Sequence, residues 1–384
     1  MSSDKPQKPE TIAAQALGWT DPETHAVAPV VHASSTYLRD ADNRYRSGRM
    51  YARADNPAYD QPEAVLAALE KGEDAMLFAS GMAAATAVFQ ALAPGDHVVV
   101  PKVMYWAFRH WLADFAKIWG LAADFVDMTD LAALKLAMRP DRTRLVWIET
   151  PANPLWEISD IAAAAEIAHA AGGRLAVDST VATPVFTRPV ELGADLVMHS
   201  ATKYLNGHSD LVAGALVTRV KDEHWERIAA VRTRIGGVLG SFEAWLLLRG
   251  MRTLFPRVRT AAANAETLAH KLAANLHVSQ VLYPGFPEFP GHAVAARQMT
   301  GGFGGMMSIR VKGGEQAAIA AAAQVEIWKR ATSLGGVESL IEHRASVEGA
   351  DTPCPPDLLR LSVGIEDAGD LLADLERALA IAHG

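Results

Sequence analysis

The chain has 384 residues, with 36 Lys and Arg against 44 Asp and Glu, so its formal net charge is −8. This balance offers no basic stripe for nucleic-acid phosphates, and no apolar run approaches the roughly 18–20 residues of a membrane span. Cys354 is the single cysteine and cannot close an internal disulfide, and the first ten residues lack the apolar centre of a secretory signal. We therefore expect a cytoplasmic protein of two or three domains that binds neither nucleic acid nor membranes.

The first 60 residues contain turn residues and aromatics but no long periodic stretch. Dipeptides such as Asp21-Pro22 and Asn56-Pro57 interrupt the backbone pattern. A segment of this kind has no hydrophobic core of its own. We expect residues 1–60 to form an arm that lies across another surface, such as that of a neighbouring subunit.

Short apolar runs of strand length recur from residue 61 onward. They are nearly continuous, as in strands buried on both faces of a parallel sheet, and helical patterns separate most of them. The sequence therefore predicts an α/β domain over residues 61–250. Its expected strands are Ala75–Ala79, Val98–Pro101, Ala123–Val126, Leu145–Glu149, Leu175–Asp178, Leu196–His199 and Ala213–Val217, and its expected helices are Pro62–Lys71, Met82–Leu92, Ala107–Trp119 and Ile161–Ala171.

A long helical pattern follows from Ser241 to Leu276, with interruptions at Gly250 and Pro256. The remaining chain mixes strand and helix patterns, which predicts a smaller α+β domain over residues 251–384. Its expected strands are Met307–Val311 and Leu359–Val363, and its expected helices are Glu315–Trp328 and Ala368–Ile381.

Polar residues follow the apolar runs at the point where each predicted strand ends. Ligands bind beyond the carboxyl ends of the strands in parallel sheets, so these residues are candidates for a shared site, although turn chemistry alone favours several of the same residue types. They are Ser80-Gly81, Tyr105, the segment Glu149 to Pro154, Asp178, and the segment Ser200 to Lys203.

Lys203 and Asp178 are the two most informative of these candidates. A lysine directly after a buried strand either reaches solvent or loses its proton and becomes a nucleophile that can form a Schiff base. Asp178 ends an apolar run and needs a partner, which a cofactor with a protonated ring nitrogen would provide; a turn or helix-capping aspartate is the alternative. Ser200, Thr202 and the helix start at Gly81 are suited to a phosphate ester.

Other residue clusters carry less chemistry. The thirteen histidines show no ligand spacing, so we expect no metal site. Trp106, Trp111 and Trp119 share one helical stretch and are typical of a core or an interface.

Seven short strings occur in order along the chain. They are Tyr51-x-Arg53-x-x-Asn56-Pro57, Ser80-Gly-Met-Ala-Ala84, Glu149-Thr-Pro-Ala-Asn-Pro154, Val177-Asp-Ser-Thr-x-Ala-Thr-Pro184, Ser200-Ala-Thr-Lys-Tyr204 with Gly207-His-Ser-Asp210, Ser333-Leu-Gly-Gly-Val-Glu-Ser-Leu340 and Arg360-Leu-Ser-Val-Gly-Ile-Glu366. Together they resemble the Cys/Met-metabolism family of pyridoxal-phosphate enzymes, which includes cystathionine γ-synthases, cystathionine β- and γ-lyases, methionine γ-lyases and homoserine sulfhydrylases. The resemblance runs from about residue 17 to the end of the chain, and it implies pyridoxal 5'-phosphate as cofactor and the aspartate aminotransferase-like transferase fold, fold type I.

The resemblance also implies residue roles. Lys203 resembles the lysine that holds the cofactor and moves substrate protons, Asp178 the partner of the ring nitrogen, and Tyr105 the stacking tyrosine that shares the acid–base work. Tyr105 is followed by Trp106-Ala107 here, where the family has glycine-rich residues. The implied cofactor-binding residues are Tyr51, Arg53, Gly81, Met82, Tyr105, Asn153, Asp178, Ser200, Thr202 and Lys203.

For the substrate, the resemblance implies that Asn153, Ser333 and Arg360 hold the amino-acid carboxylate. Tyr51 and Arg53 would reach the cofactor phosphate of the neighbouring subunit, and family members are usually homotetramers built as dimers of dimers. The expected partner is therefore a small amino acid, together with further copies of this chain.

Several positions depart from the family pattern. Thr332 stands where many γ-acting members have glutamate, and the tract His343 to Gly349 differs from the family's His-Pro-Ala tract at the expected pocket rim. We expect an enzyme that makes or breaks C–S bonds, of the cystathionine γ-synthase or lyase type, with γ-replacement, γ-elimination and β-elimination all open. The alternatives are a methionine γ-lyase, a homoserine sulfhydrylase, an aminotransferase or desulfurase of the same fold, and a catalytically silent binding protein.

Overall fold

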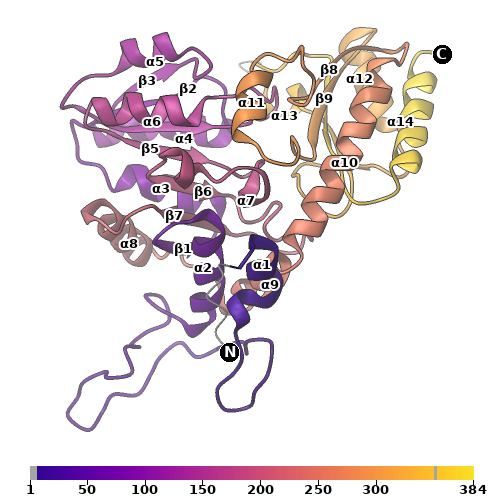
Figure 1. Cartoon of the computed structure of the whole chain (residues 1–384). Helices are drawn as coiled ribbons and strands as arrows, with labels where there is room; N and C mark the ends of the chain where they lie inside the picture. The colour runs from indigo at the N-terminus through magenta and orange to yellow at the C-terminus, as the bar shows by residue number, and fades with distance from the viewer. Residues whose placement is uncertain (1–6, 350–352) are drawn as a thin grey trace.

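Figure 1 shows the computed structural model, which describes residues 7–349 and 353–384. Residues 1–6, the start of the predicted arm, lie outside the described part of the chain. The chain builds a seven-stranded sheet from its first half and a five-stranded sheet from its second, and the two stand side by side.

The seven-stranded sheet has the strand order β1-β7-β6-β5-β4-β2-β3. Neighbouring strands from β6 to β3 run parallel, and β7 is antiparallel to both of its neighbours. The predicted, mainly parallel seven-stranded sheet is confirmed, and each strand boundary lies within two residues of its expected place. The strands are β1 (Asp74–Phe78), β2 (His97–Pro101), β3 (Ala122–Val126), β4 (Thr143–Glu149), β5 (Arg174–Asp178), β6 (Leu196–His199) and β7 (Gly214–Thr218).

Helices cover both faces of this sheet because alternate strand residues point to opposite faces. In β2, Val98 and Val100 pack with α3 (Gly81–Gln90) and α4 (Trp106–Trp119). Val99 packs instead in the core of α5 (Leu131–Ala137) and α6 (Ile161–Ala170). Further helices near this sheet are α2 (Pro57–Glu70), α7 (Thr183–Phe186), α8 (Glu223–Ile235) and the 3-10 turn η2 (Pro189–Leu192).

Helix α2 begins five residues before the expected start at Pro62. The Asn56 side chain accepts a hydrogen bond from the backbone N–H of Ala58, and Pro57 occupies the first helical position. Both features are typical of a helix N-terminus, so the Asn56-Pro57 pair starts a helix rather than a turn.

The five-stranded sheet has the order β10-β11-β12-β9-β8, and its antiparallel pairs and flanking helices make the predicted α+β half. The boundary at residue 250 stays a prediction. The elements are α9 (Ser241–Met251), α10 (Leu254–Ala273), β8 (Val278–Leu282), α11 (His292–Gln298), β9 (Met306–Val311), α12 (Gly314–Ala323), β10 (Lys329–Arg330), β11 (Leu340–His343), α13 (Ala345–Glu348), β12 (Leu358–Ser362) and α14 (Ala368–Ala382).

Two helix predictions in this half are wrong in detail. The interruption expected at Pro256 lies at Thr253 instead, because Pro256 is the third residue of α10, where a backbone N–H has no partner within the helix. The helix expected to reach Trp328 ends at Ala323, since the Asp374 carboxylate accepts backbone hydrogen bonds from residues 326–328 and draws them out of the helix.

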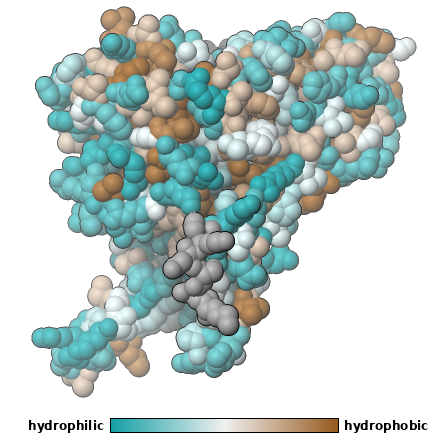
Figure 2. Space-filling model, in the orientation of Figure 1, coloured by the Kyte–Doolittle hydropathy of each residue, from teal (hydrophilic) through white to brown (hydrophobic). Residues whose placement is uncertain are grey.

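The predicted arm leaves the body of the molecule (Figure 1). It starts in α1 (Pro9–Gln15) and the 3-10 turn η1 (Ala16–Gly18), which pack on the chain's own core, whereas no residue from 17 to 55 is buried. Leu38 is 94% exposed, and Figure 2 shows hydrophobic residues among the hydrophilic ones on this protrusion. Within the described ranges, no helix is long and apolar enough to cross a bilayer.

Candidate active site

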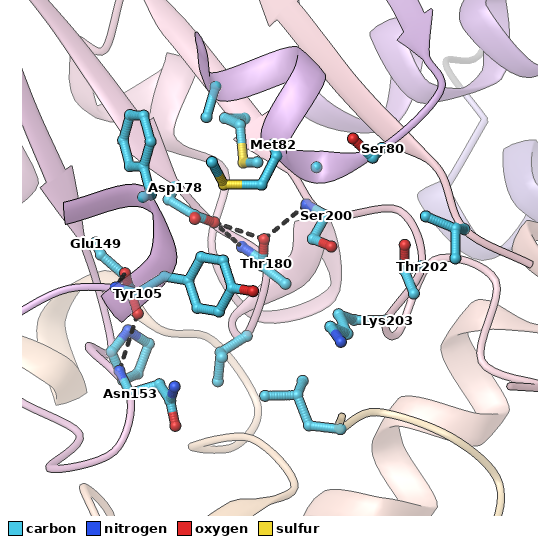
Figure 3. Close-up of a pocket in the computed structure, with 18 residues that line it drawn as sticks. Ser80, Met82, Tyr105, Glu149, Asn153, Asp178, Thr180, Ser200, Thr202 and Lys203 are labelled. Carbon is cyan, nitrogen blue, oxygen red and sulfur yellow. Dashed lines mark hydrogen bonds between the residues drawn. The ribbon is translucent and has the colours of Figure 1, made fainter. Parts of the chain in front are cut away.

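A cavity of about 340 Å³ opens beyond the carboxyl ends of β4, β5 and β6 (Figure 3). Most of the predicted site residues meet there, while Ser333 and Arg360 approach from the second half of the chain and Tyr51 and Arg53 lie on the arm. The predicted residues that line the cavity are Gly81, Met82, Tyr105, Asn153, Asp178, Ser200, Thr202 and Lys203.

Lys203 lies in the turn that follows β6, and its side chain is half-buried. Its Nζ donates a hydrogen bond of 2.7 Å to Oγ of Ser333. Burial, and secondarily the positive charge of Arg360, lower the pKa of Lys203 from its ordinary 10.5 to about 8. A substantial fraction of the amine is therefore neutral, and hence nucleophilic, near physiological pH.

This lowered pKa predicts how the cofactor-free protein takes up pyridoxal phosphate. The neutral amine reacts, so the rate of covalent uptake should rise about tenfold per pH unit below pH 8 and level off above it. Absorbance of the lysine adduct, followed by stopped flow, measures this rate. N-α-acetyl-lysine is the control, with its inflection near pH 10.5, and the same high inflection in the protein would contradict the lowered pKa.

Asp178 is the last residue of β5 and faces the same cavity. Thr180 donates both its backbone N–H (3.0 Å) and its hydroxyl (2.5 Å) to Oδ1 of Asp178. No described residue donates to Oδ2. Burial raises the pKa of Asp178, so its ionised form needs a positive partner, and a protonated ring nitrogen would supply one.

The opposite end of the cavity offers donors for an anionic group. Helix α3 begins at Gly81, and Ser80 caps the N–H of Ala83 with its Oγ. The N–H groups of Gly81 and Met82 have no partner among the described residues. A Cβ on Gly81 would lie 2.8 Å from Oγ of Ser200, so only glycine leaves this cradle open. Backbone N–H groups at a helix start, with a hydroxyl beside them, fit a phosphate.

Arg360 lies buried in β12, directly opposite Glu342 in the antiparallel register. Its Nη2 forms an ion pair with Glu342 (2.6 Å) and donates to the backbone oxygen of Ser333 (2.7 Å), and its Nη1 donates to Oδ1 of Asn153 (3.3 Å). Ser333 has a φ of +86°, a strained value typical of functional sites. Together these residues present a guanidinium suited to a carboxylate.

Two positions that depart from the family pattern, Thr332 and Arg344, do not line the cavity itself. Arg344, in the divergent tract after His343, is 2% exposed and sits behind Arg360, where its Nη1 donates to Glu342 (3.1 Å). Neither Arg344 nor the exposed Thr332 lines the cavity. Arg344 therefore belongs to the buried ion pairs behind Arg360, whereas Thr332 lies at the surface beside Ser333.

Tyr51 and Arg53 do not reach the cavity of their own chain. Arg53 donates to the backbone oxygen of Thr233 (3.2 Å) and lies 5.8 Å from the ring centre of Tyr51, which is 46% exposed. In one chain, the site thus lacks both residues.

Thr180 and Glu149 both line the cavity. Sequence reasoning gave Thr180 no role, and it named Glu149 only as the first residue of a candidate segment. The spacing of Thr180, two residues after Asp178, is the usual pattern of an Asx turn and could have indicated its contact. Among residues 7–349 and 353–384, no three His, Cys, Asp or Glu side chains gather as a metal site.

Arg257 on α10 anchors the turn that carries Lys203. Its guanidinium donates to the backbone oxygens of Tyr204 (3.0 Å), Leu205 (3.4 Å) and Gly250 (2.8 Å), all in a buried setting. Replacing Arg257 by Met leaves the buried carbonyls of Tyr204 and Leu205 without this donor, whereas Gly250 still accepts the N–H and the hydroxyl of Thr253. We expect a loss of about 3 kcal/mol of stability. Thermal unfolding at fixed protein concentration measures it, with exposed Arg249→Met as control; an unchanged midpoint would contradict the anchoring.

Comparison with known proteins identifies the family. A profile described as "Cys/Met metabolism PLP-dependent enzyme" matches residues 10–380. The chain belongs to this family. It is therefore an enzyme of sulfur amino-acid metabolism that uses pyridoxal 5'-phosphate, and the free Asp178 Oδ2, the cradle at Gly81 and the lowered pKa of the Lys203 amine all fit that cofactor.

Two curated relatives and one solved structure illustrate the similarity. The chain is 46% identical to the cystathionine γ-synthase of Mycobacterium tuberculosis, covering 97% of this chain and 96% of the relative. It is 41% identical to the cystathionine γ-lyase of Bacillus subtilis, covering 94% and 96%. A crystal structure of cystathionine γ-synthase from Xanthomonas oryzae pv. oryzae, in complex with aminoacrylate and cysteine, superposes with a TM-score of 0.94 at 39% identity over 99% of each chain. The predicted transferase fold is confirmed.

Proposed function

We propose that this enzyme is a cystathionine γ-synthase, which joins the sulfur of cysteine to the γ carbon of an acylated homoserine. The observation that carries the proposal is the 46% identity to a cystathionine γ-synthase over nearly the whole chain, against 41% for a cystathionine γ-lyase. The lyase reaction is the second candidate, since the same residues serve both.

Bound pyridoxal phosphate withdraws electrons from the α carbon of an amino acid, which makes its α proton removable. Lys203 supplies the amine that holds the cofactor and, once the substrate has displaced it, takes the α proton on Nζ. Asp178 keeps the ring nitrogen protonated through its free Oδ2. Chemistry at the γ carbon needs a second proton removed from Cβ, and we assign this work to Lys203 and Tyr105.

The remaining residues bind and orient. The N–H groups of Gly81 and Met82 and the hydroxyls of Ser200 and Thr202 hold the phosphate. Arg360 binds the amino-acid carboxylate, with Asn153 and Ser333 beside it, because its guanidinium is held in place by Glu342.

The reaction is tested with purified enzyme under two conditions. With an acylated homoserine and cysteine we expect cystathionine, detected by mass spectrometry. With cystathionine alone, a dominant yield of 2-oxobutyrate or pyruvate would favour a lyase. Transfer of the amino group to a keto acid would indicate an aminotransferase, and no turnover despite bound cofactor would indicate a silent member.

We further propose a homotetramer in which each active site takes Tyr51 and Arg53 from the neighbouring subunit. The exposed arm supports this proposal, because Tyr51 and Arg53 lie outside the cavity of their own chain. The proposed compartment is the cytoplasm, which suits a chain whose single cysteine cannot close an internal disulfide.

Subunit mixing tests the shared site. Lys203→Ala and the double variant Tyr51→Phe/Arg53→Ala should each be nearly inactive. When the two variants are unfolded together and refolded, about half of the dimers should contain one subunit of each kind. One of the two sites in such a mixed dimer has all three wild-type residues, so about one quarter of wild-type activity should return. The two variants refolded separately and then combined are the control, and equal activity in both samples would contradict sharing.

A further inference from the structure

Glu149 has a buried carboxyl group that the proposed reaction does not use. It is the last residue of β4 and is 7% exposed. Its Oε2 accepts the backbone N–H of Tyr105 at 2.8 Å, and its Oε1 accepts the backbone N–H of Asn153 at 3.0 Å (Figure 3). One side chain thus fixes two segments that come from different parts of the chain.

The two segments carry residues with different proposed tasks. Tyr105 precedes α4 as its capping residue, and its side chain makes no capping hydrogen bond. Its backbone oxygen accepts from the first turn of α4, whereas its backbone N–H donates to Glu149, the contact that ties it to β4. Asn153 accepts a hydrogen bond from Arg360. A chain of hydrogen bonds through Glu149 and Asn153 therefore connects Tyr105 to Arg360.

A direct acid–base role is the alternative for Glu149. Burial and the neighbouring Asp178, its register partner on β5, raise the pKa of Glu149. Both carboxyl oxygens, however, are already occupied by backbone N–H groups at good hydrogen-bond distance. That engagement favours a structural part in catalysis over proton transfer to the substrate.

We propose that Glu149 is a positioning residue. Its carboxyl group holds the backbones of Tyr105 and Asn153 in place, so that the Tyr105 side chain contacts the cofactor while the Asn153 side chain contacts the substrate. The inference rests on the proposed roles of Tyr105 and Asn153. The last residue of β4 would then affect the reaction through the two segments that it binds.

The most informative variant is Glu149→Gln. It keeps the shape of the side chain but replaces one acceptor oxygen by an NH2 group, which cannot accept a hydrogen bond from a backbone N–H. We expect kcat to fall about 30-fold with the cofactor still on its lysine, and the visible circular dichroism of the bound cofactor to weaken, because Tyr105 is displaced. Glu157→Gln is the matched control. Glu149 also borders a neighbouring small cavity of about 140 Å³, which Lys102 and Glu157 line as well. The Glu157 side chain has no hydrogen bond to either segment, so both readouts should stay at wild-type values.

A double-mutant cycle separates positioning from a general loss of structure. If Glu149 acts through Tyr105, then Tyr105→Phe should cost at least fivefold less in kcat in the Glu149→Gln background than in wild type. Strict additivity, or an unchanged dichroism band, would overturn the proposal. Should Glu149→Gln fail to fold, Glu149→Asp takes its place, since it keeps the charge but is too short to reach both N–H groups. The proposed function is tested separately: if the wild-type enzyme forms no cystathionine from an acylated homoserine and cysteine, the proposed function fails whatever the Glu149 variants show.

Discussion

Replacing Lys203 by alanine should abolish covalent attachment of pyridoxal phosphate and lower kcat by roughly a thousandfold or more. Lys203 is the cavity-lining lysine whose amine is partly neutral near pH 8, so its removal takes away both the attachment point and the base for the α proton. Borohydride reduction followed by peptide mass spectrometry locates the label, and turnover gives kcat.

Lys102→Ala is the matched control, because this exposed lysine lies beside the neighbouring small cavity and should leave the label on Lys203. A label that persists in Lys203→Ala, or that maps to another lysine in wild type, would sink the proposed mechanism.

Replacing Asp178 by asparagine should leave the cofactor on Lys203 but lower kcat by roughly a thousandfold. Asparagine keeps an oxygen for the two donors of Thr180, so the local shape is preserved. It carries no negative charge, however, and cannot hold a proton on the ring nitrogen. Exchange of the substrate α proton into deuterated water, followed by NMR, isolates the affected step.

Asp178→Glu provides the control for charge. It restores a carboxylate at a shifted position and should recover part of the lost exchange rate. If Asp178→Asn lowers kcat less than tenfold, protonation of the ring nitrogen does not depend on this carboxylate.

The cofactor half of the site could be predicted from local sequence. Lys203 and Asp178 each follow an apolar run, and parallel strands bring their carboxyl ends to one edge, so a pattern of strands and helices was sufficient to place them together. The helix start at Gly81 was visible for the same reason.

The substrate half could not be read from local patterns. Lys203 and Ser333 are 130 residues apart, and Asn153 and Arg360 are 207 apart, so only resemblance to a family brought them together. The burial of Arg344 depends on how β11 pairs with β12, which places Glu342 opposite Arg360, and no periodicity reveals that pairing. The prediction of the helix end at Trp328 was wrong because the distant Asp374 carboxylate accepts hydrogen bonds from the backbone N–H groups there.

The two sheets divide the proposed site between them. The seven-stranded sheet carries the amine, the ring partner and the phosphate cradle, whereas Ser333 and Arg360 come from the five-stranded half. An amino acid bound in the cavity would thus contact residues from both halves of the chain. Substitutions of the residues around Arg360 can consequently change which amino acid is accepted, while the ring partner Asp178 and the phosphate cradle at Gly81 stay as they are in the other half.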